Sequence, residues 1–163
     1  MHKLILLCPL FLSLIVFSCS KDDDPTIATA TILASEGLDE LSLGLSGSEV
    51  KSKLGDNYFE ISTSAGNNLL SYQMDYDAVG LALNMGTADE DANIDNLTVS
   101  SITITAPFKG TTPEGIGIGN SKQEVESTYP NPEILEFWNT YEYEGISYAF
   151  NDSDEVIRIF VFD

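Results

Sequence analysis

Histidine is nearly absent from this sequence, since His2 is the only one in 163 residues. Ser-His-Asp and Cys-His nucleophilic sites require an imidazole, and zinc sites are assembled from several Cys and His side chains. His2 stands at the start of an apolar N-terminal run. We therefore expect no such site, no cofactor and no enzyme activity. A carboxylate pair of the glycosidase kind stays open as an alternative, although no feature singles out a pair among the acidic residues.

Basic residues are also scarce, because 7 Lys and Arg stand against 26 Asp and Glu, for a formal net charge of −19. A field of this sign repels the phosphate backbone of DNA and RNA. Nucleic acid is therefore excluded as a partner. The charge instead favours solubility, cations and basic patches on other proteins.

Long hydrophobic runs are missing as well, and the longest, residues 4–17, is too short to span a bilayer comfortably. After His2 and Lys3 it has the form of a secretory signal. It also contains Cys8, one of only two cysteines. If the signal is removed, Cys19 has no disulfide partner.

The boundary Phe17-Ser18-Cys19 resembles a bacterial lipobox, in which a small residue precedes the acylated cysteine. This resemblance implies a signal peptide over 1–18, cleavage before Cys19 and acyl chains that anchor the protein to a membrane. Phe17 stands where a smaller residue is usual, and a plain signal peptide is the alternative.

Residues 19–36, in which Cys19 is followed by Ser-Lys-Asp-Asp, are predicted to form an acidic, flexible tether. This start resembles the export signal of surface lipoproteins in some Gram-negative bacteria. The resemblance implies an outer-membrane protein displayed on the cell surface, with the periplasmic face as the alternative.

Residues 116–125 repeat the pattern of residues 41–50 without a gap. Serine and glutamate recur three residues apart, as Ser46 with Glu49 and as Ser121 with Glu124. This spacing is typical of a capping box at a helix start. Each helix is short, so we expect each to lie against a sheet through Val50 or Val125.

Three strands are predicted after each helix, at 69–76, 79–85 and 97–105, and at 137–143, 146–150 and 156–162. Residues 61–68 and 86–96 are interpreted as insertions in the first copy. The predicted fold class is α+β, with two tandem copies of a short helix packed on a three-stranded antiparallel meander. The copies cover 37–106 and 107–163.

These patterns together resemble the SmpA/OmlA (BamE-like) small outer-membrane lipoproteins and the tandem module of β-lactamase-inhibitory proteins. The resemblance implies a helix-on-sheet module that binds other proteins without catalysis. The inhibitory proteins' disulfides are missing, so their specific activity is not implied. The expected function is a lipid-anchored protein-binding module. An envelope-assembly accessory lipoprotein and a carbohydrate binder are the alternatives.

The alternation of residues in 146–150 and 156–162 places Arg158 and Phe160 on the open side of the sheet. Trp138 is expected to join them from the first strand of the second copy. Trp and Arg are enriched where binding energy concentrates, so these three residues form the predicted partner-binding patch. The alternative is that Trp138 and Phe160 fill the seam between the copies or complete the core.

Oxygen-bearing side chains alternate over residues 89–95, as they do in calcium loops. However, Ile94 stands where such loops need glycine, and Ser100 stands where the bidentate glutamate belongs. We interpret this segment as a solvated acidic loop and expect no metal, with weak calcium binding left open.

Overall fold

The computed structural model describes residues 26–64, 70–89 and 91–163. The predicted signal and most of the tether, including Cys19, lie outside these ranges. The elements are, in chain order, η1 (Thr26–Thr29), β1 (Ile32–Leu33), β2 (Gly37–Leu38), β3 (Leu41–Ser42), α1 (Gly47–Leu54), β4 (Phe59–Ser64), β5 (Leu70–Tyr76), β6 (Leu81–Thr87), η2 (Ile94–Asn96), β7 (Val99–Thr105), α2 (Lys122–Thr128), β8 (Glu133–Leu135), η3 (Glu136–Trp138), β9 (Thr140–Tyr143), β10 (Ile146–Phe150) and β11 (Val156–Phe162).

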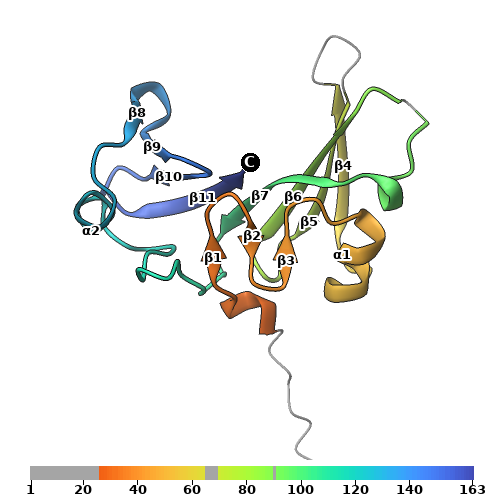
Figure 1. The fold of residues 1–163 in the computed structure, drawn as a ribbon, viewed down its shortest axis with the longest axis horizontal. Coiled ribbons are helices and arrows are strands. Elements are labelled where there is room, and N and C mark those ends of the chain that lie inside the picture. Colours follow the sequence, from red (N-terminus) through yellow and green to blue (C-terminus); the bar gives the residue numbers. More distant parts are fainter. Residues whose placement is uncertain (1–25, 65–69, 90) are drawn as a thin grey trace, which may run out of the picture.

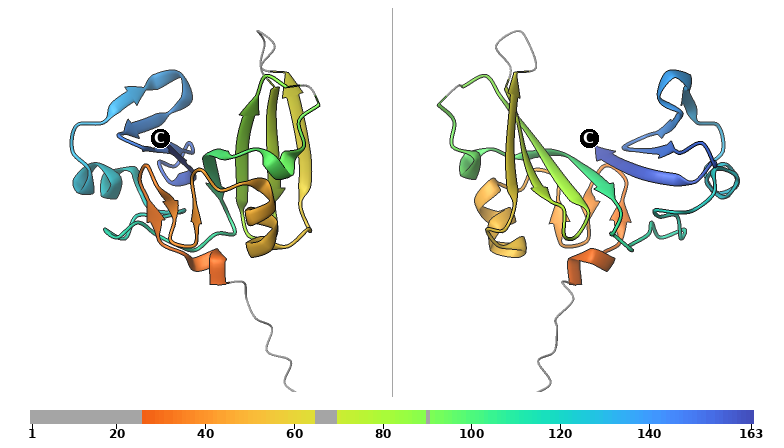
Figure 2. Two further views of the ribbon diagram at one scale, coloured as in Figure 1. Left: turned by 45° about the vertical axis from the view of Figure 1, so that its right-hand side comes forward. Right: turned by 180° about the vertical axis from the view of Figure 1, so that it is seen from behind.

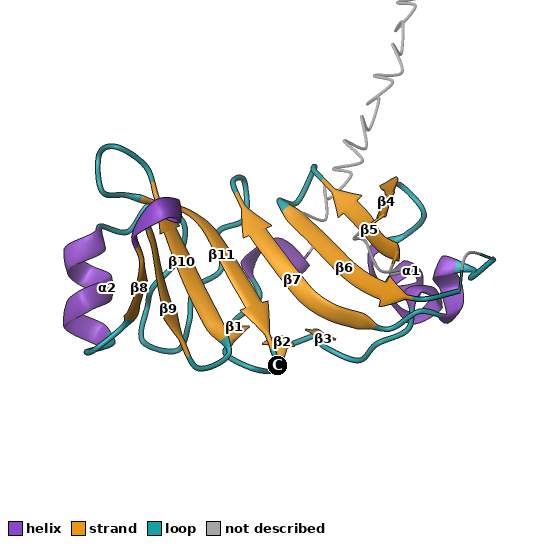
Figure 3. Cartoon of the chain, turned by 90° about the horizontal axis from the view of Figure 1, so that it is seen from above, coloured by secondary structure: helices purple, strands orange, loops and turns teal. Residues whose placement is uncertain are grey.

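Most of this chain is β structure, arranged in two antiparallel sheets (Figure 1). The large sheet has eight strands in the order β4-β5-β6-β7-β11-β10-β9-β8, and the small sheet has the order β1-β2-β3. The predicted α+β class, with two tandem copies of a helix packed on a three-stranded meander, is therefore wrong. The described helices α1 and α2 are short, and they lie near opposite ends of the large sheet (Figure 3).

The prediction failed because β7 and β11 pair with each other and merge the two sets of strands into one sheet. Ile104 lies opposite Ile159, and Ile102 lies opposite Val161. All four side chains are fully buried. Without this pairing, both strands would carry an edge of unsatisfied backbone groups. Pairing between strands so far apart in the sequence leaves no local signal.

The core lies between the large sheet and the small one, which covers the middle of one face (Figures 1 and 2). Ile32, Leu38 and Leu41 of the small sheet are buried in the same core as Ile102 and Ile159. Ile32 belongs to the segment predicted as the end of the tether. Its apolar side chain is better explained as part of the core than as part of a hydrated linker.

The two capping boxes are confirmed. The backbone N–H of Ser46 donates to Glu49 Oε2 at 2.8 Å, and that of Ser121 donates to Glu124 Oε2 at 2.7 Å. Each serine hydroxyl in turn accepts from the backbone N–H of the same glutamate. Within the described residues, no helix has the length and apolar character needed to cross a membrane.

One predicted insertion is wrong, because its first residues belong to β4. Phe59 and Ile61 of this strand lie opposite Asp75 and Gln73 of β5. These two apolar side chains are exposed rather than buried. Strand β4 therefore forms one edge of the large sheet, and β8 forms the other edge.

Candidate functional site

The face of the large sheet that points away from the small sheet is open. On this face β10 and β11 present side chains in alternation with the core residues of the same strands. Ser147 lies opposite Phe160, and Ala149 lies opposite Arg158. The outward alternation predicted for these two strands from the sequence is confirmed by this register.

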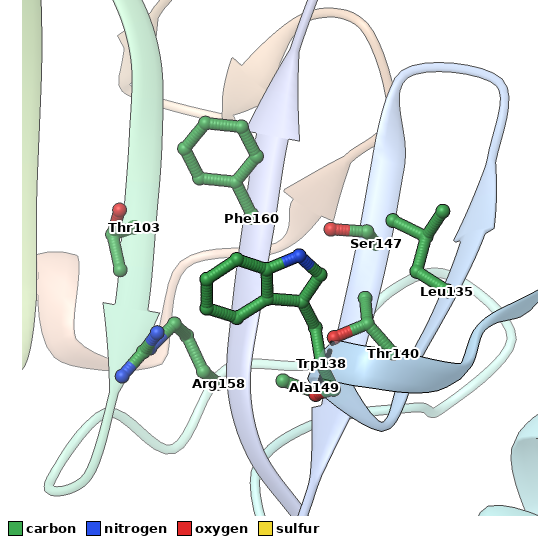
Figure 4. A pocket seen from close by; sticks show the side chains of 8 residues that line it. All are labelled: Thr103, Leu135, Trp138, Thr140, Ser147, Ala149, Arg158 and Phe160. Carbon is green, nitrogen blue, oxygen red and sulfur yellow. Dashed lines mark hydrogen bonds between the residues drawn. The ribbon is translucent and has the colours of Figure 1, made fainter.

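The open face is hollowed over β9, β10, β11 and η3 (Figure 4). The hollow has a volume of about 460 Å³. We call it the Arg158 hollow. It is lined by Thr103, Leu135, Trp138, Thr140, Ser147, Ala149, Arg158 and Phe160.

Small side chains on the neighbouring strands make room for Arg158 and Phe160. Arg158 lies between Ala149 of β10 and Thr105 of β7, while Phe160 lies between Ser147 and Thr103 of the same two strands. A long or branched apolar residue at Ala149 would fill the hollow. The depth of the hollow therefore follows from the short side chains that flank β11.

Trp138 reaches the hollow from η3, not from the first strand of the second half as the sequence predicted. The next residue, Asn139, has a left-handed backbone with φ of 46° and ends this turn. The side-chain amide of Asn139 donates to the backbone carbonyl of Phe150 at 3.1 Å. The backbone carbonyl of Asn139 accepts from the Phe150 N–H at 3.0 Å. These bonds fix the turn against β10, so the position of Trp138 is set by the backbone beside it.

The indole ring itself is poorly covered, since 69% of Trp138 is exposed to solvent. Its ring contacts that of Phe137, at 4.9 Å between centroids in an edge-to-face arrangement. Trp138 therefore fills neither a seam nor the core, and this alternative is wrong for that residue. Phe160 is only partly covered and lies on the same open side.

The electrostatic character of the Arg158 hollow differs from that of the whole protein. Among the described residues that line it, none is acidic, although the sequence has 26 Asp and Glu. A neighbouring hollow of about 500 Å³ is lined instead by acidic residues, namely Glu133, Glu142, Glu144 and Asp163, together with other side chains. Arg158 and these four acidic side chains therefore line different hollows.

The hydroxyl groups in the Arg158 hollow are mostly used inside the protein. Thr140 Oγ1 donates to the carbonyl of Trp138 at 3.0 Å. Thr103 Oγ1 accepts from the side-chain amide of Asn84 at 3.4 Å. No imidazole, carboxylate or amine of the described lining residues could activate a hydroxyl as a nucleophile. The arrangement can bind an anion and an apolar group side by side.

The structure thus brings together Trp138, Arg158 and Phe160, the three residues of the predicted binding patch. Sequence reasoning missed Leu135 and Thr103, because no local pattern marks either residue as part of the patch. Thr103 joins the hollow only because β7 pairs with β11. The predicted lipidation residue, Cys19, lies outside the described residues.

Side-chain oxygen atoms of the acidic loop at residues 89–95 form hydrogen bonds within the loop and an ion pair with α1. Asp95 forms an ion pair with Lys51, and Asn93 Oδ1 accepts from the backbone N–H of Asp95 at 2.9 Å. Asp89 Oδ1 accepts from the Asp91 N–H at 3.0 Å. In the part of the chain that the structure describes, no three His, Cys, Asp or Glu side chains converge as a metal site would require.

Comparisons of this chain with known protein families, with curated proteins and with solved structures give no match.

Proposed function

We propose that this protein is a non-catalytic, protein-binding lipoprotein, held at the outer membrane and displayed on the cell surface of a Gram-negative bacterium. The observation that carries the binding part is the exposure of Trp138 beside Phe160 and Arg158 in one hollow. A large aromatic ring left in water gains free energy when a partner covers it.

The residue types in the hollow favour a protein partner. Trp and Arg are the residues that most often dominate the binding energy of protein interfaces. The hollow is also open to solvent, and Trp138 within it is 69% exposed, so a partner surface can reach it (Figure 4). The walls are held by strand pairing, which reduces the entropy lost on binding.

The membrane part of the proposal depends on the sequence of residues 1–24. An apolar run that ends at Ser18-Cys19 and is followed by an acidic segment fits an acylated anchor and a hydrated linker. Mass spectrometry of the N-terminal peptide from the native host should show acyl chains on Cys19. An unmodified peptide that begins at Met1 or Ser20 would contradict the anchor.

Partner capture tests the binding part. Intact cells carrying the protein are treated with a crosslinker, and the protein is recovered in mild detergent. The double variant Trp138→Ala and Phe160→Ala should lose the crosslinked partner while it stays folded, with the free energy of unfolding lowered by no more than about 2 to 3 kcal/mol. Phe59→Ala is the matched control, because Phe59 is also 69% exposed but lies at the far edge of the sheet.

Two results would count against the proposal. Equal capture by the wild type and the double variant would show that the hollow is not the binding surface. A partner that belongs to the outer-membrane assembly machinery would favour the accessory-lipoprotein alternative.

A further inference from the structure

The cation in the Arg158 hollow is unusual for this protein. Arg158 is the only arginine in the sequence. Two of the lysines, Lys51 and Lys122, form ion pairs with Asp95 and Asp154. No ion pair or hydrogen bond joins the Arg158 side chain to another residue within the described ranges. Its guanidinium is thus free to form the paired hydrogen bonds that arginine makes with carboxylates.

The other side chains of the hollow determine which chemical group can bind beside the anion. The Trp138 ring and Phe160 offer apolar surface beside Arg158, and Leu135 lies on the far side of the hollow (Figure 4). A sugar would need several polar groups to bind its hydroxyls, but the hollow has only three hydroxyl side chains, and two of them, Thr140 and Thr103, already bond to Trp138 and Asn84. The hollow therefore suits a carboxylate beside an apolar group better than it suits an acidic sugar.

The spacing of the two features follows from the strand. Arg158 and Phe160 are two residues apart on the same side of β11. Such residues are separated by roughly 7 Å along a strand. In an extended partner segment, side chains at positions i and i+2 have the same spacing and also point to one side.

We propose that the Arg158 hollow binds an acidic side chain and an apolar side chain, two residues apart, in an extended segment of a protein partner. This inference rests on the proposed function and names the chemistry of its partner. The carboxylate pairs with Arg158, while the apolar side chain covers Trp138 and Phe160. The protein as a whole is strongly acidic and repels a partner carboxylate. The hollow can accept one, because none of its described lining residues is acidic.

Trp138 is the only tryptophan in the chain, so its fluorescence reports from inside the hollow. The protein, purified from cells that express the full chain, is titrated with a blocked tripeptide of glutamate, alanine and leucine. The glutamine version of this peptide is the matched probe. We expect a saturable fluorescence change with the glutamate peptide and binding weaker by about tenfold or more with the glutamine peptide.

The Arg158→Gln variant should lose the preference for glutamate over glutamine. Lys53→Gln removes the same charge at an exposed site on α1 and should keep the preference. Phe160→Ala should weaken both peptides, because it removes apolar contact without touching the cation. Thermal melts establish that each variant is folded.

Three outcomes would overturn the inference. These are equal binding of both peptides, unchanged discrimination in Arg158→Gln, and no response up to about 10 mM peptide. Binding of a glucuronate oligosaccharide in place of the peptide would show that the partner class is wrong. If cells lose the crosslinked partner with the Trp138 and Phe160 double variant but keep it with Arg158→Gln, this inference fails while the proposed function stands.

Discussion

The large sheet has two halves, the first formed by β4 to β7 and the second by β8 to β11. Their covered faces are similar, whereas their open faces differ. On the covered side, β6 and β7 present Leu83, Ile102 and Ile104, while β11 presents Ile159 and Val161. On the open side, the first half carries mostly small or polar residues, namely Ser71, Gln73, Ala82, Asn84, Ser101 and Thr103. The second half carries Trp138, Arg158 and Phe160 there.

This difference separates the residues that hold the fold from those available for binding. The covered side must be apolar in both halves, because both contribute to one core. The open side has no such requirement. The first half carries Phe59 and Ile61 there, at the β4 edge of the sheet, whereas Trp138 and Phe160 of the second half line one hollow together with Arg158. The proposed binding role therefore concerns the second half, and changes on the two sides of the sheet should differ in their effect on stability.

The largest effect is expected from a charge on the covered side. Val50 of α1 and Val125 of α2 are both fully buried, and each follows its capping box directly. Changing either valine to aspartate buries an unpaired charge and should reduce the free energy of unfolding by about 3 to 5 kcal/mol. Urea denaturation measures this loss.

Aspartate at Ser48 and at Gln123 provides the matched controls, since each lies exposed two residues before the corresponding valine. We expect these controls to stay close to the wild type. If one valine variant keeps wild-type stability, the two helices do not contribute equally to the core.

Alkaline pH should affect the second half more strongly than the first. Burial raises the pKa of Tyr148 far above its ordinary value, and burial also raises the pKa values of Tyr129 and Tyr143. In the first half, burial raises the pKa of Tyr76 to about 12. Tyr148 packs between Tyr129 and Tyr143, with ring centroids 5.9 and 6.0 Å away.

The sign of this effect follows from linkage between ionisation and folding. Unfolded tyrosines ionise near pH 10, whereas the buried ones stay protonated in the folded protein to higher pH. The stabilisation is complete below pH 10 and is lost as pH rises toward the folded pKa. The free energy of unfolding should fall by about 1 to 3 kcal/mol between pH 8 and pH 11. Tyr148→Phe should reduce this fall more than Tyr76→Phe does, and the reverse order would contradict the comparison.

The capping boxes should give nearly equal, smaller effects in the two halves. Ser46→Ala and Ser121→Ala each remove one side-chain acceptor at a helix start, which costs about 1 kcal/mol. Hydrogen bonds from the serine backbone, and then from the serine hydroxyl, lower the pKa values of Glu49 and Glu124. These carboxylates therefore stabilise the fold fully above their ordinary pKa, the value in the unfolded chain. The stabilisation is lost as pH falls through the lowered pKa of the folded protein. Urea melts from pH 7 to pH 3 should show a shallower acid dependence in each serine variant.

The parts of this structure that the sequence predicted are those that depend on near neighbours. Ser46 and Ser121 identify the helix starts through a spacing of three residues, and alternation in β11 places Arg158 and Phe160 on one side. The turn at residues 144–145 follows from Gly145, which has a left-handed φ of 73°.

The parts that it did not predict depend on distant pairing. Thr103 and Phe160 are opposite each other only through the β7–β11 junction, and no local pattern specifies that pair. The small sheet contains only two-residue strands, so its alternation is too brief to recognise. Trp138 was assigned to a strand because its aromatic neighbours suggested one, whereas the left-handed Asn139 ends a turn there.

The smallest effect on stability is expected at the open face, where the comparison has its functional meaning. Trp138 and Phe59 are each 69% exposed, the first beside Arg158 and the second at the β4 edge. Changing either to alanine removes little buried apolar surface and should lower the free energy of unfolding by less than about 1 kcal/mol. Phe160→Ala should cost more, about 1 to 2 kcal/mol, because Phe160 is partly covered. A loss of several kcal/mol in Trp138→Ala would show that the ring supports the fold, and the hollow would then have no exposed aromatic residue to offer a partner. The expected result is a small loss of stability in both Trp138→Ala and Phe59→Ala, with partner capture lost only in Trp138→Ala. The two exposed rings would then contribute equally little to stability, and only the ring in the second half would contribute to binding.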